Sequence, residues 1–84
     1  PESPSFSYGE YVKWEYKQIG AKIVYYRRLR GYTQETLAFK AGISTSYLSR
    51  IERGAYENGI SLSTFMKIAK ALDVNVSKLF EVET

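Results

Sequence analysis

The sequence predicts an all-α fold, and three observations lead to that prediction. Apolar residues recur at spacings of three and four along several segments, which is the period of an amphipathic helix. Ser, Thr or Asn precedes each of these segments, and Gly follows three of them, as at the starts and ends of helices. No segment shows the sustained apolar and polar alternation of a half-buried strand. With 84 residues, the chain can form one domain with a modest core.

The first expected helix is long and runs from Tyr8 to about Arg30, either unbroken or as two helices in near line. Ser7 begins a capping-box pattern that would start it, and Gly31 would end it. Its apolar face continues across Gly20, although a glycine weakens a helix by roughly 1 kcal/mol relative to alanine. The residues of that face are Val12, Tyr16, Ile19, Ile23 and Tyr26.

A second stripe on a neighbouring face of this helix consists of Tyr11, Trp14, Ala21 and Tyr25. One short bundle cannot easily cover both stripes, and large exposed aromatic patches mark interaction sites. We therefore expect the second stripe to contact another copy of the chain. The alternative is that the N-terminal extension folds back on its own domain. We assign residues 1–18 to a partly helical extension and residues 19–84 to the domain proper.

Four shorter helices are expected to follow, each beginning after a residue suited to capping. Their caps are Thr33, Ser44, Ser61 and Asn75. The first two are expected to end near Lys40 and Arg53, and the last is a short helix that carries Leu79 and Phe80. The helix that begins after Ser61 has the clearest amphipathic stripe, formed by Leu62, Phe65, Ile68, Ala69 and Leu72.

Composition excludes several classes of function. Cysteine and histidine are both absent, so disulfides, thiolate metal sites and His-dependent catalytic groups are absent too. The nine acidic residues are scattered and form no pair placed for acid and base catalysis. We expect no enzyme activity, no cofactor and no metal. The lack of cysteine suits the cytoplasm, and no apolar run is long enough to cross a membrane. Because the chain begins at Pro1 rather than Met, we expect a processed or trimmed fragment.

Residues 34–54 carry the functional information. A small residue, Ala38, would let two short helices approach near a tight turn, and Gly42 can adopt the positive φ that the turn needs. The opposite face of the second helix consists of Thr45, Ser46, Ser49 and Arg50. These hydrogen-bonding side chains stand on a helix that could enter the major groove of DNA. The net charge of +3 favours an anionic partner only mildly.

In order and spacing, the motifs of this chain resemble the Cro and phage-repressor helix-turn-helix family, also called the xenobiotic-response-element family. The matching pieces are Thr33-Gln34-Glu35, Leu37-Ala38, Ala41-Gly42-Ile43-Ser44, residues 47–54, Ser61-Leu62 and residues 68–72. The resemblance covers residues 19–80. It implies a compact five-helix bundle of the lambda-repressor type that binds specific double-stranded DNA. It also implies a transcription regulator that acts as a homodimer on a palindromic operator.

The resemblance further implies roles for individual residues. Base contacts are expected from Thr45, Ser46, Ser49 and Arg50, and phosphate contacts from Gln34, Tyr47, Arg53 and Lys40. Arg27 and Glu52 match positions that form an ion pair between the first and third helices. Simpler roles stay open for three of these residues. Thr45 and Ser46 also suit the first turn of a helix, and packing is the favoured role of the Tyr47 ring.

Two departures from the family pattern keep a rival function open. The loop at residues 55–60 is longer than usual and contains Glu57 where a basic residue is common, which weakens the case for phosphate contact there. The N-terminal extension is also unusually aromatic. The rival is a protein-interaction module on the same fold without DNA binding.

Overall fold

The computed structural model describes residues 8–55 and 59–81, with side chains from Trp14 onward, and the regular elements of this part of the chain are all helices. It consists of α1 (Tyr8–Leu29), α2 (Gln34–Ala41), α3 (Thr45–Arg53), α4 (Leu62–Leu72) and the 3-10 helix η1 (Val76–Phe80). The all-α class is therefore confirmed. The described residues contain four α-helices, and a 3-10 helix stands where a fifth helix was expected.

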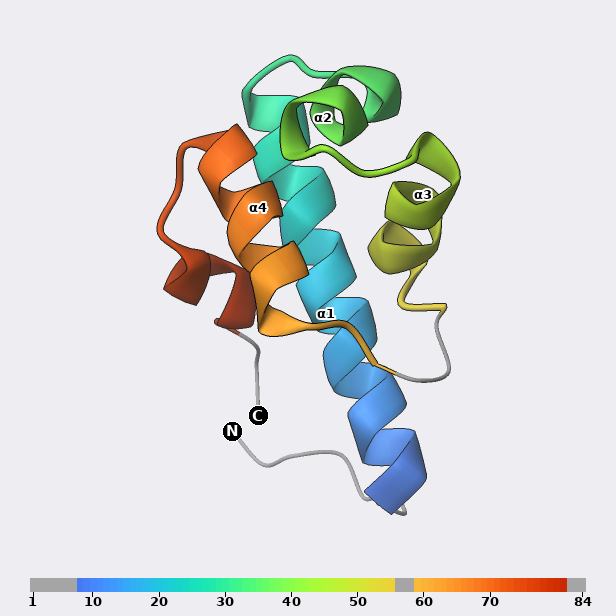
Figure 1. The fold of residues 1–84 in the computed structure, drawn as a ribbon. Coiled ribbons are helices and arrows are strands. Elements are labelled where there is room, and N and C mark those ends of the chain that lie inside the picture. Colours follow the sequence, from blue (N-terminus) through green and yellow to red (C-terminus); the bar gives the residue numbers. More distant parts are fainter. Residues whose placement is uncertain (1–7, 56–58, 82–84) are drawn as a thin grey trace.

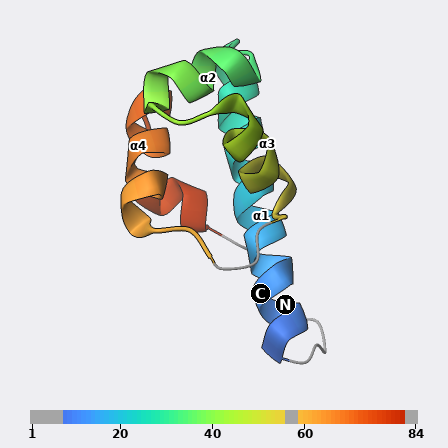
Figure 2. The same ribbon diagram turned by 45° about the vertical axis from the view of Figure 1, so that its right-hand side comes forward.

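The first helix, α1, is unbroken over 22 residues, so the single long helix is the version that forms. The upper part of α1 packs against α3, α4 and η1. Its first turns extend beyond the bundle in both Figure 1 and Figure 2, and they continue the helix rather than folding back. Ser7 and the rest of residues 1–7 lie outside the described part, as does the loop segment 56–58 with Glu57.

Local capping explains where the short helices begin. The hydroxyl oxygens of Thr33 and Ser44 accept hydrogen bonds at 3.0 Å from the backbone N–H groups of Thr36 and Tyr47. Ser61 caps α4 in the same way, at 3.3 Å. Each bond satisfies an amide that has no partner within the helix. Three of the four predicted caps are thus confirmed, and so is the fourth, because Asn75 Oδ1 accepts a hydrogen bond from the Ser77 N–H at 3.0 Å.

The core lies between α1 and the shorter helices. Its largest fully buried side chains are Ile23, Leu37, Leu48, Ile51, Ile68, Leu72 and Leu79. Leu62 was expected on the apolar stripe of α4, but it is 58% exposed because it occupies the first helical position, away from the packed turns. At the other end of the bundle, Arg30 donates a hydrogen bond from Nε to the Leu72 carbonyl at 2.8 Å. No helix among the described residues is long and apolar enough to cross a membrane.

Candidate nucleic-acid interface

The turn between α2 and α3 is tight because Gly42 adopts a left-handed conformation, with φ of 72°. The backbone N–H of Ile43 then donates to the Ala38 carbonyl at 3.0 Å, which closes the end of α2. Ala38 itself is 1% exposed and packs into the core cluster. A larger side chain at Ala38 would separate the helices, so the predicted roles of Ala38 and Gly42 are both confirmed.

The third helix, α3, has sharply different faces. Leu48, Ile51 and Glu52 are buried against the bundle. The outward face brings together Thr45, Ser46, Ser49, Arg50 and Arg53, the four predicted base-contacting residues and one predicted phosphate contact. Figure 1 shows α3 at the right edge of the molecule.

Side chains on this outward face also contact one another. The Arg53 Nη1 donates to the Ser49 hydroxyl at 2.6 Å, one helical turn away. The Arg50 guanidinium lies 5.7 Å from the centroid of the Tyr47 ring, within the range of a cation–π contact. Tyr47 is half-buried and packs against the core, so the favoured packing role holds. These contacts hold both guanidinium groups along the outward face of α3.

A buried hydrogen-bonded network joins the three helices around this face. Arg27 on α1 contacts both carboxylate oxygens of Glu52 on α3, with Nε–Oε2 at 2.7 Å and Nη2–Oε1 at 3.2 Å. The two side chains are only 12% and 4% exposed. Arg27 also donates from Nη1 to the Tyr32 carbonyl at 3.0 Å. This bidentate geometry, with two N–H···O hydrogen bonds, is the strong form of an arginine–carboxylate pair.

The third helix in the network is α2, through Gln34. Its amide nitrogen donates to Glu52 Oε1 at 2.8 Å, a contact that sequence reasoning missed. Gln34 is the first residue of α2 and is half-buried. A primary amide carries two N–H donors, and this bond uses one of them. The signal in the sequence is weak, because the two residues are 18 positions apart.

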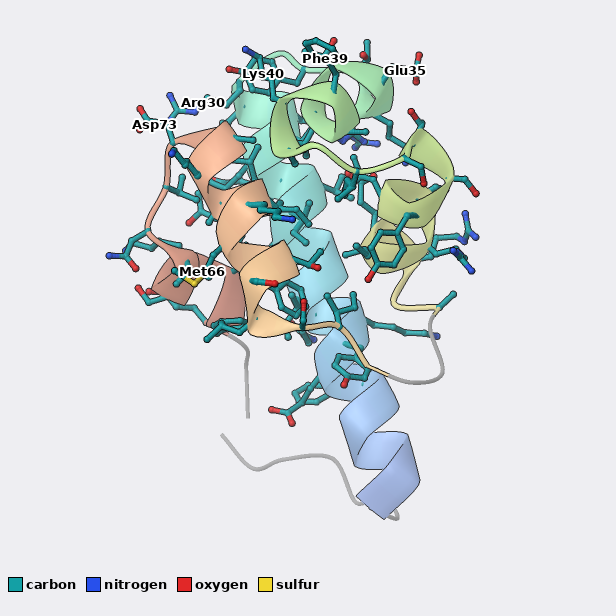
Figure 3. All side chains as sticks on the ribbon, in the orientation of Figure 1. Arg30, Glu35, Phe39, Lys40, Met66 and Asp73 are labelled. Carbon is teal, nitrogen blue, oxygen red and sulfur yellow. The ribbon has the colours of Figure 1, made fainter. Side chains whose placement is uncertain are left out.

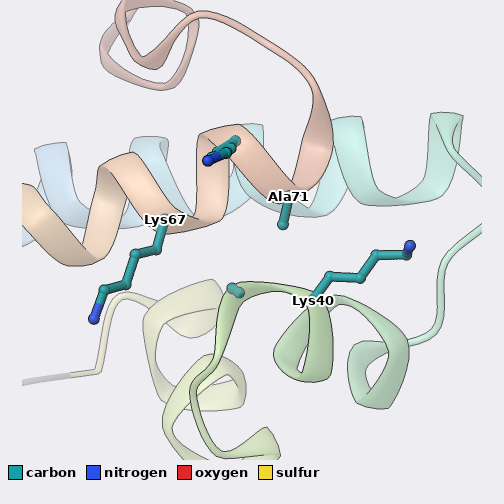
Figure 4. Close-up of a pocket in the computed structure, with 5 residues that line it drawn as sticks. Lys40, Lys67 and Ala71 are labelled. Atoms are coloured by element: carbon teal, nitrogen blue, oxygen red, sulfur yellow. The ribbon is translucent and has the colours of Figure 1, made fainter.

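Lys40, another predicted phosphate contact, lies away from the outward face of α3. Its Nζ is 5.3 Å from the centroid of the Tyr32 ring. Figure 3 shows it on the same side as Arg30 and Asp73, whereas Glu35 is at the opposite end of α2. Together with residues of α4, Lys40 borders a groove lined by Ala41, Lys67, Lys70 and Ala71, seen in Figure 4.

Close approach between α1 and α3 depends on Gly20. A Cβ atom there would lie 2.5 Å from the Glu52 carbonyl oxygen and 2.6 Å from that of Ile51. In the sequence, this contact is indicated only by a glycine inside an otherwise helical pattern, which often has a packing reason. The missing side chain at Gly20 therefore determines how closely α3 packs against α1.

Two short helices joined by a tight turn, with the second turned outward and polar, define a helix-turn-helix domain. This chain belongs to the HTH_3 family of helix-turn-helix domains, whose family model matches residues 23–79.

Relatives and solved structures agree with this family. The transcriptional regulator SlrR from Bacillus subtilis is 42% identical over 66 residues, which are 79% of this chain and 43% of SlrR. The chain likewise spans 56% of SinR from Bacillus subtilis, so it covers about half the length of these relatives. A crystal structure of SinR in complex with DNA matches with a TM-score of 0.69 and 41% identity, over 75% of this chain and 98% of that one. The restriction-modification controller protein C.AhdI from Aeromonas hydrophila matches with a TM-score of 0.75 and 36% identity, over 80% and 98%.

Proposed function

We propose that this chain binds specific double-stranded DNA as part of a transcription regulator, with α3 in the major groove. The observation that carries the proposal is the distribution of charge on α3. Glu52, the one acidic residue of this helix, is buried and paired, while Arg50 and Arg53 are exposed beside hydroxyl side chains. The outward face is thus cationic and able to hydrogen-bond, as a base-reading helix needs to be.

Phosphate contacts would hold the register of this helix on the duplex. The second N–H of Gln34 can donate to a phosphate at the start of α2, where the amides of a helix N-terminus also favour an anion. Arg53 and the Tyr47 hydroxyl complete this set of proposed phosphate contacts. We leave Lys40 out of the interface, because it lies on the other side of α2.

We further propose that the domain acts as a homodimer on a palindromic operator. One such reading helix covers a single half-site, and dimers of this class bind half-sites about one helical turn apart, roughly 34 Å. The solved complex of the SinR relative with DNA supports the DNA-binding part of this proposal.

Selection of bound sequences from a random DNA library tests the function directly. A helix that reads base edges should enrich one half-site sequence, and binding to it should weaken steeply as salt rises because counterions are released. Selection without enrichment, together with binding that salt hardly alters, would favour the rival protein-interaction module. Among the described residues, Phe39 is the large apolar side chain with the greatest exposure, 87%, and this exposure favours the rival.

We predict that Arg50→Ala lowers affinity for the selected site by about 1–3 kcal/mol and relaxes the base preference at one position. A guanidinium can donate hydrogen bonds to both major-groove acceptors of guanine, so its loss removes a base-specific contact as well as a positive charge. Lys67→Ala, which removes one exposed charge from α4, is the matched control and should leave the base preference unchanged. Equal weakening on all sequences would make Arg50 a phosphate contact only.

Gln34→Ala should weaken binding by a similar factor on all sequences, because a phosphate contact carries no base information. The same change removes the bond to Glu52, so thermal unfolding must be measured in parallel to correct for the folded fraction. Competition between selected and scrambled DNA is the deciding measurement. A changed base preference would show that Gln34 acts in some other way.

A further inference from the structure

One face of α1 is exposed at Ala21, Tyr25 and Arg28, and Trp14 and Gln18, which continue this face toward the N-terminus, are half-buried. The residues of this face, which we call the α1 seam, are Trp14, Gln18, Ala21, Tyr25 and Arg28. Ala21 and Arg28 are exposed, and Tyr25 is 57% exposed. The buried residues of α1, Ile19 and Ile23, lie on the opposite side of the helix.

The spacing of the α1 seam is that of a coiled coil. Its members are separated by four, three, four and three residues, which is the heptad pattern that keeps one stripe facing a second helix. A shallow groove of about 400 Å³ lies beside it, lined by Gln18, Ala21, Lys22, Tyr25 and Tyr26. The small Ala21 opens this groove to a side chain from a facing helix. An edge-to-face contact between Tyr25 and Tyr26, with ring centroids 5.1 Å apart, holds one of its walls.

We propose that two copies of this chain pair through their α1 seams, with the two helices antiparallel. The seam is complementary to itself in that orientation. With the two-fold axis midway between Ile19 and Gly20, Trp14 lies opposite the partner's Tyr25, and Gln18 lies opposite the partner's Ala21. Large side chains thus meet at both ends, and the smallest residue faces the polar one at the centre.

Charge on the flanks of the seam selects the antiparallel orientation. Glu15 and Lys22 stand beside the seam on the same flank, and within the described part of the chain neither forms an ion pair. In an antiparallel pair the same flank of each helix meets, so Glu15 faces the partner's Lys22 twice. A parallel pair would bring the opposite flanks together and place Lys17 against the partner's Lys22, which is repulsive.

This pairing leaves the outward face of α3 free. The third helix packs on a different side of α1, against Gly20 and Arg27, and its C-cap residue Gly54 lies against Lys17 on one flank of the seam. The pairing rests on the proposed function, because it is the contact that would join the two DNA-binding domains of the dimer. The experiments below are done without DNA, so their outcome is independent of whether α3 reads bases.

Charge reversal tests the pairing on the whole chain by sedimentation equilibrium at low salt. Lys22→Glu or Glu15→Lys alone replaces two attractive contacts by two repulsive ones, and we expect the dimer dissociation constant to rise about tenfold. The double variant Glu15→Lys/Lys22→Glu restores both pairs and should recover the original constant. Lys67→Glu on α4 is the control and should have no effect. A monomeric parent chain, or single variants that dimerise unchanged, would overturn the proposal.

Cysteine cross-linking tests the orientation, because the chain has no cysteine of its own. A mixture of Gln18→Cys and Ala21→Cys chains should form a covalent heterodimer on oxidation. Tyr25→Cys alone should not cross-link, because in an antiparallel pair its two copies lie about 16 Å apart along the helices. A disulfide tolerates only about 7 Å between Cα atoms. Efficient cross-linking of Tyr25→Cys would show that the helices are parallel and would overturn the antiparallel arrangement.

Discussion

Glu52→Ala is expected to destabilise this domain by about 3–5 kcal/mol, because it leaves the Arg27 guanidinium buried without its partner. The carboxylate accepts three hydrogen bonds, two from Arg27 and one from Gln34, and its side chain is only 4% exposed. Domains of this size are stable by only about 5–15 kcal/mol in all. The variant should therefore be largely unfolded under mild denaturing conditions.

Urea unfolding followed by circular dichroism measures this loss. Glu81→Ala, which removes a carboxylate that is 55% exposed, is the matched control and should change stability by less than about 0.5 kcal/mol. The double variant Arg27→Met/Glu52→Leu should be less destabilised than Glu52→Ala, since no charge is left buried alone. If Glu52→Ala and Glu81→Ala cost the same, the network contributes no net stability.

The same network has a consequence for recognition. Arg27, Glu52 and Gln34 come from α1, α3 and α2, so one carboxylate fixes the angle between the reading helix and the start of α2. Under the proposed function, base contacts come from α3 and a phosphate contact from α2. The spacing between the two kinds of contact is then set by Glu52, a residue that would itself touch no DNA.

Local features of the fold, which depend on residues close together in the chain, could be predicted from the sequence. Helix starts follow from Thr33, Ser44 and Ser61, whose side chains bond an amide three residues later. The turn follows from Gly42, because only its local backbone conformation matters. The apolar spacings likewise predicted the burial of Ile19 and Ile23 on α1, while the side chains of Tyr11 and Val12 lie outside the described residues.

Contacts between segments far apart in the chain were harder to predict. The resemblance named Arg27 and Glu52 as partners, yet no pattern in the sequence indicates that Gln34 joins them. Lys40 is a basic residue near the turn, but the direction of its side chain depends on how α2 lies against α4. For Gly20, helix propensity shows only the cost of a glycine, because the reason for a glycine there lies on α3.

Gly20→Ala is accordingly expected to destabilise the domain, although alanine is the better helix former by about 1 kcal/mol. The added Cβ would sit 2.5 Å from the Glu52 carbonyl oxygen, 2.6 Å from that of Ile51 and 2.8 Å from the Glu52 carbonyl carbon. All three are backbone atoms, so no side chain can turn aside, and α3 must move away from α1. Forcing an extra carbon into a packed interface costs about 1–3 kcal/mol.

Whether Gly20→Ala lowers or raises the free energy of unfolding shows which effect is larger, the packing of α1 against α3 or the helix propensity of alanine. Urea unfolding of Gly20→Ala should show a net loss, whereas Lys67→Ala, an alanine on the exposed side of α4, should lie within about 0.5 kcal/mol of the parent chain. A Gly20→Ala chain that is more stable than its parent would mean that α3 can shift at no cost. Displacement of α3 also moves the Arg27 and Gln34 contacts of Glu52. The variant should therefore bind the selected DNA more weakly even after correction for its folded fraction.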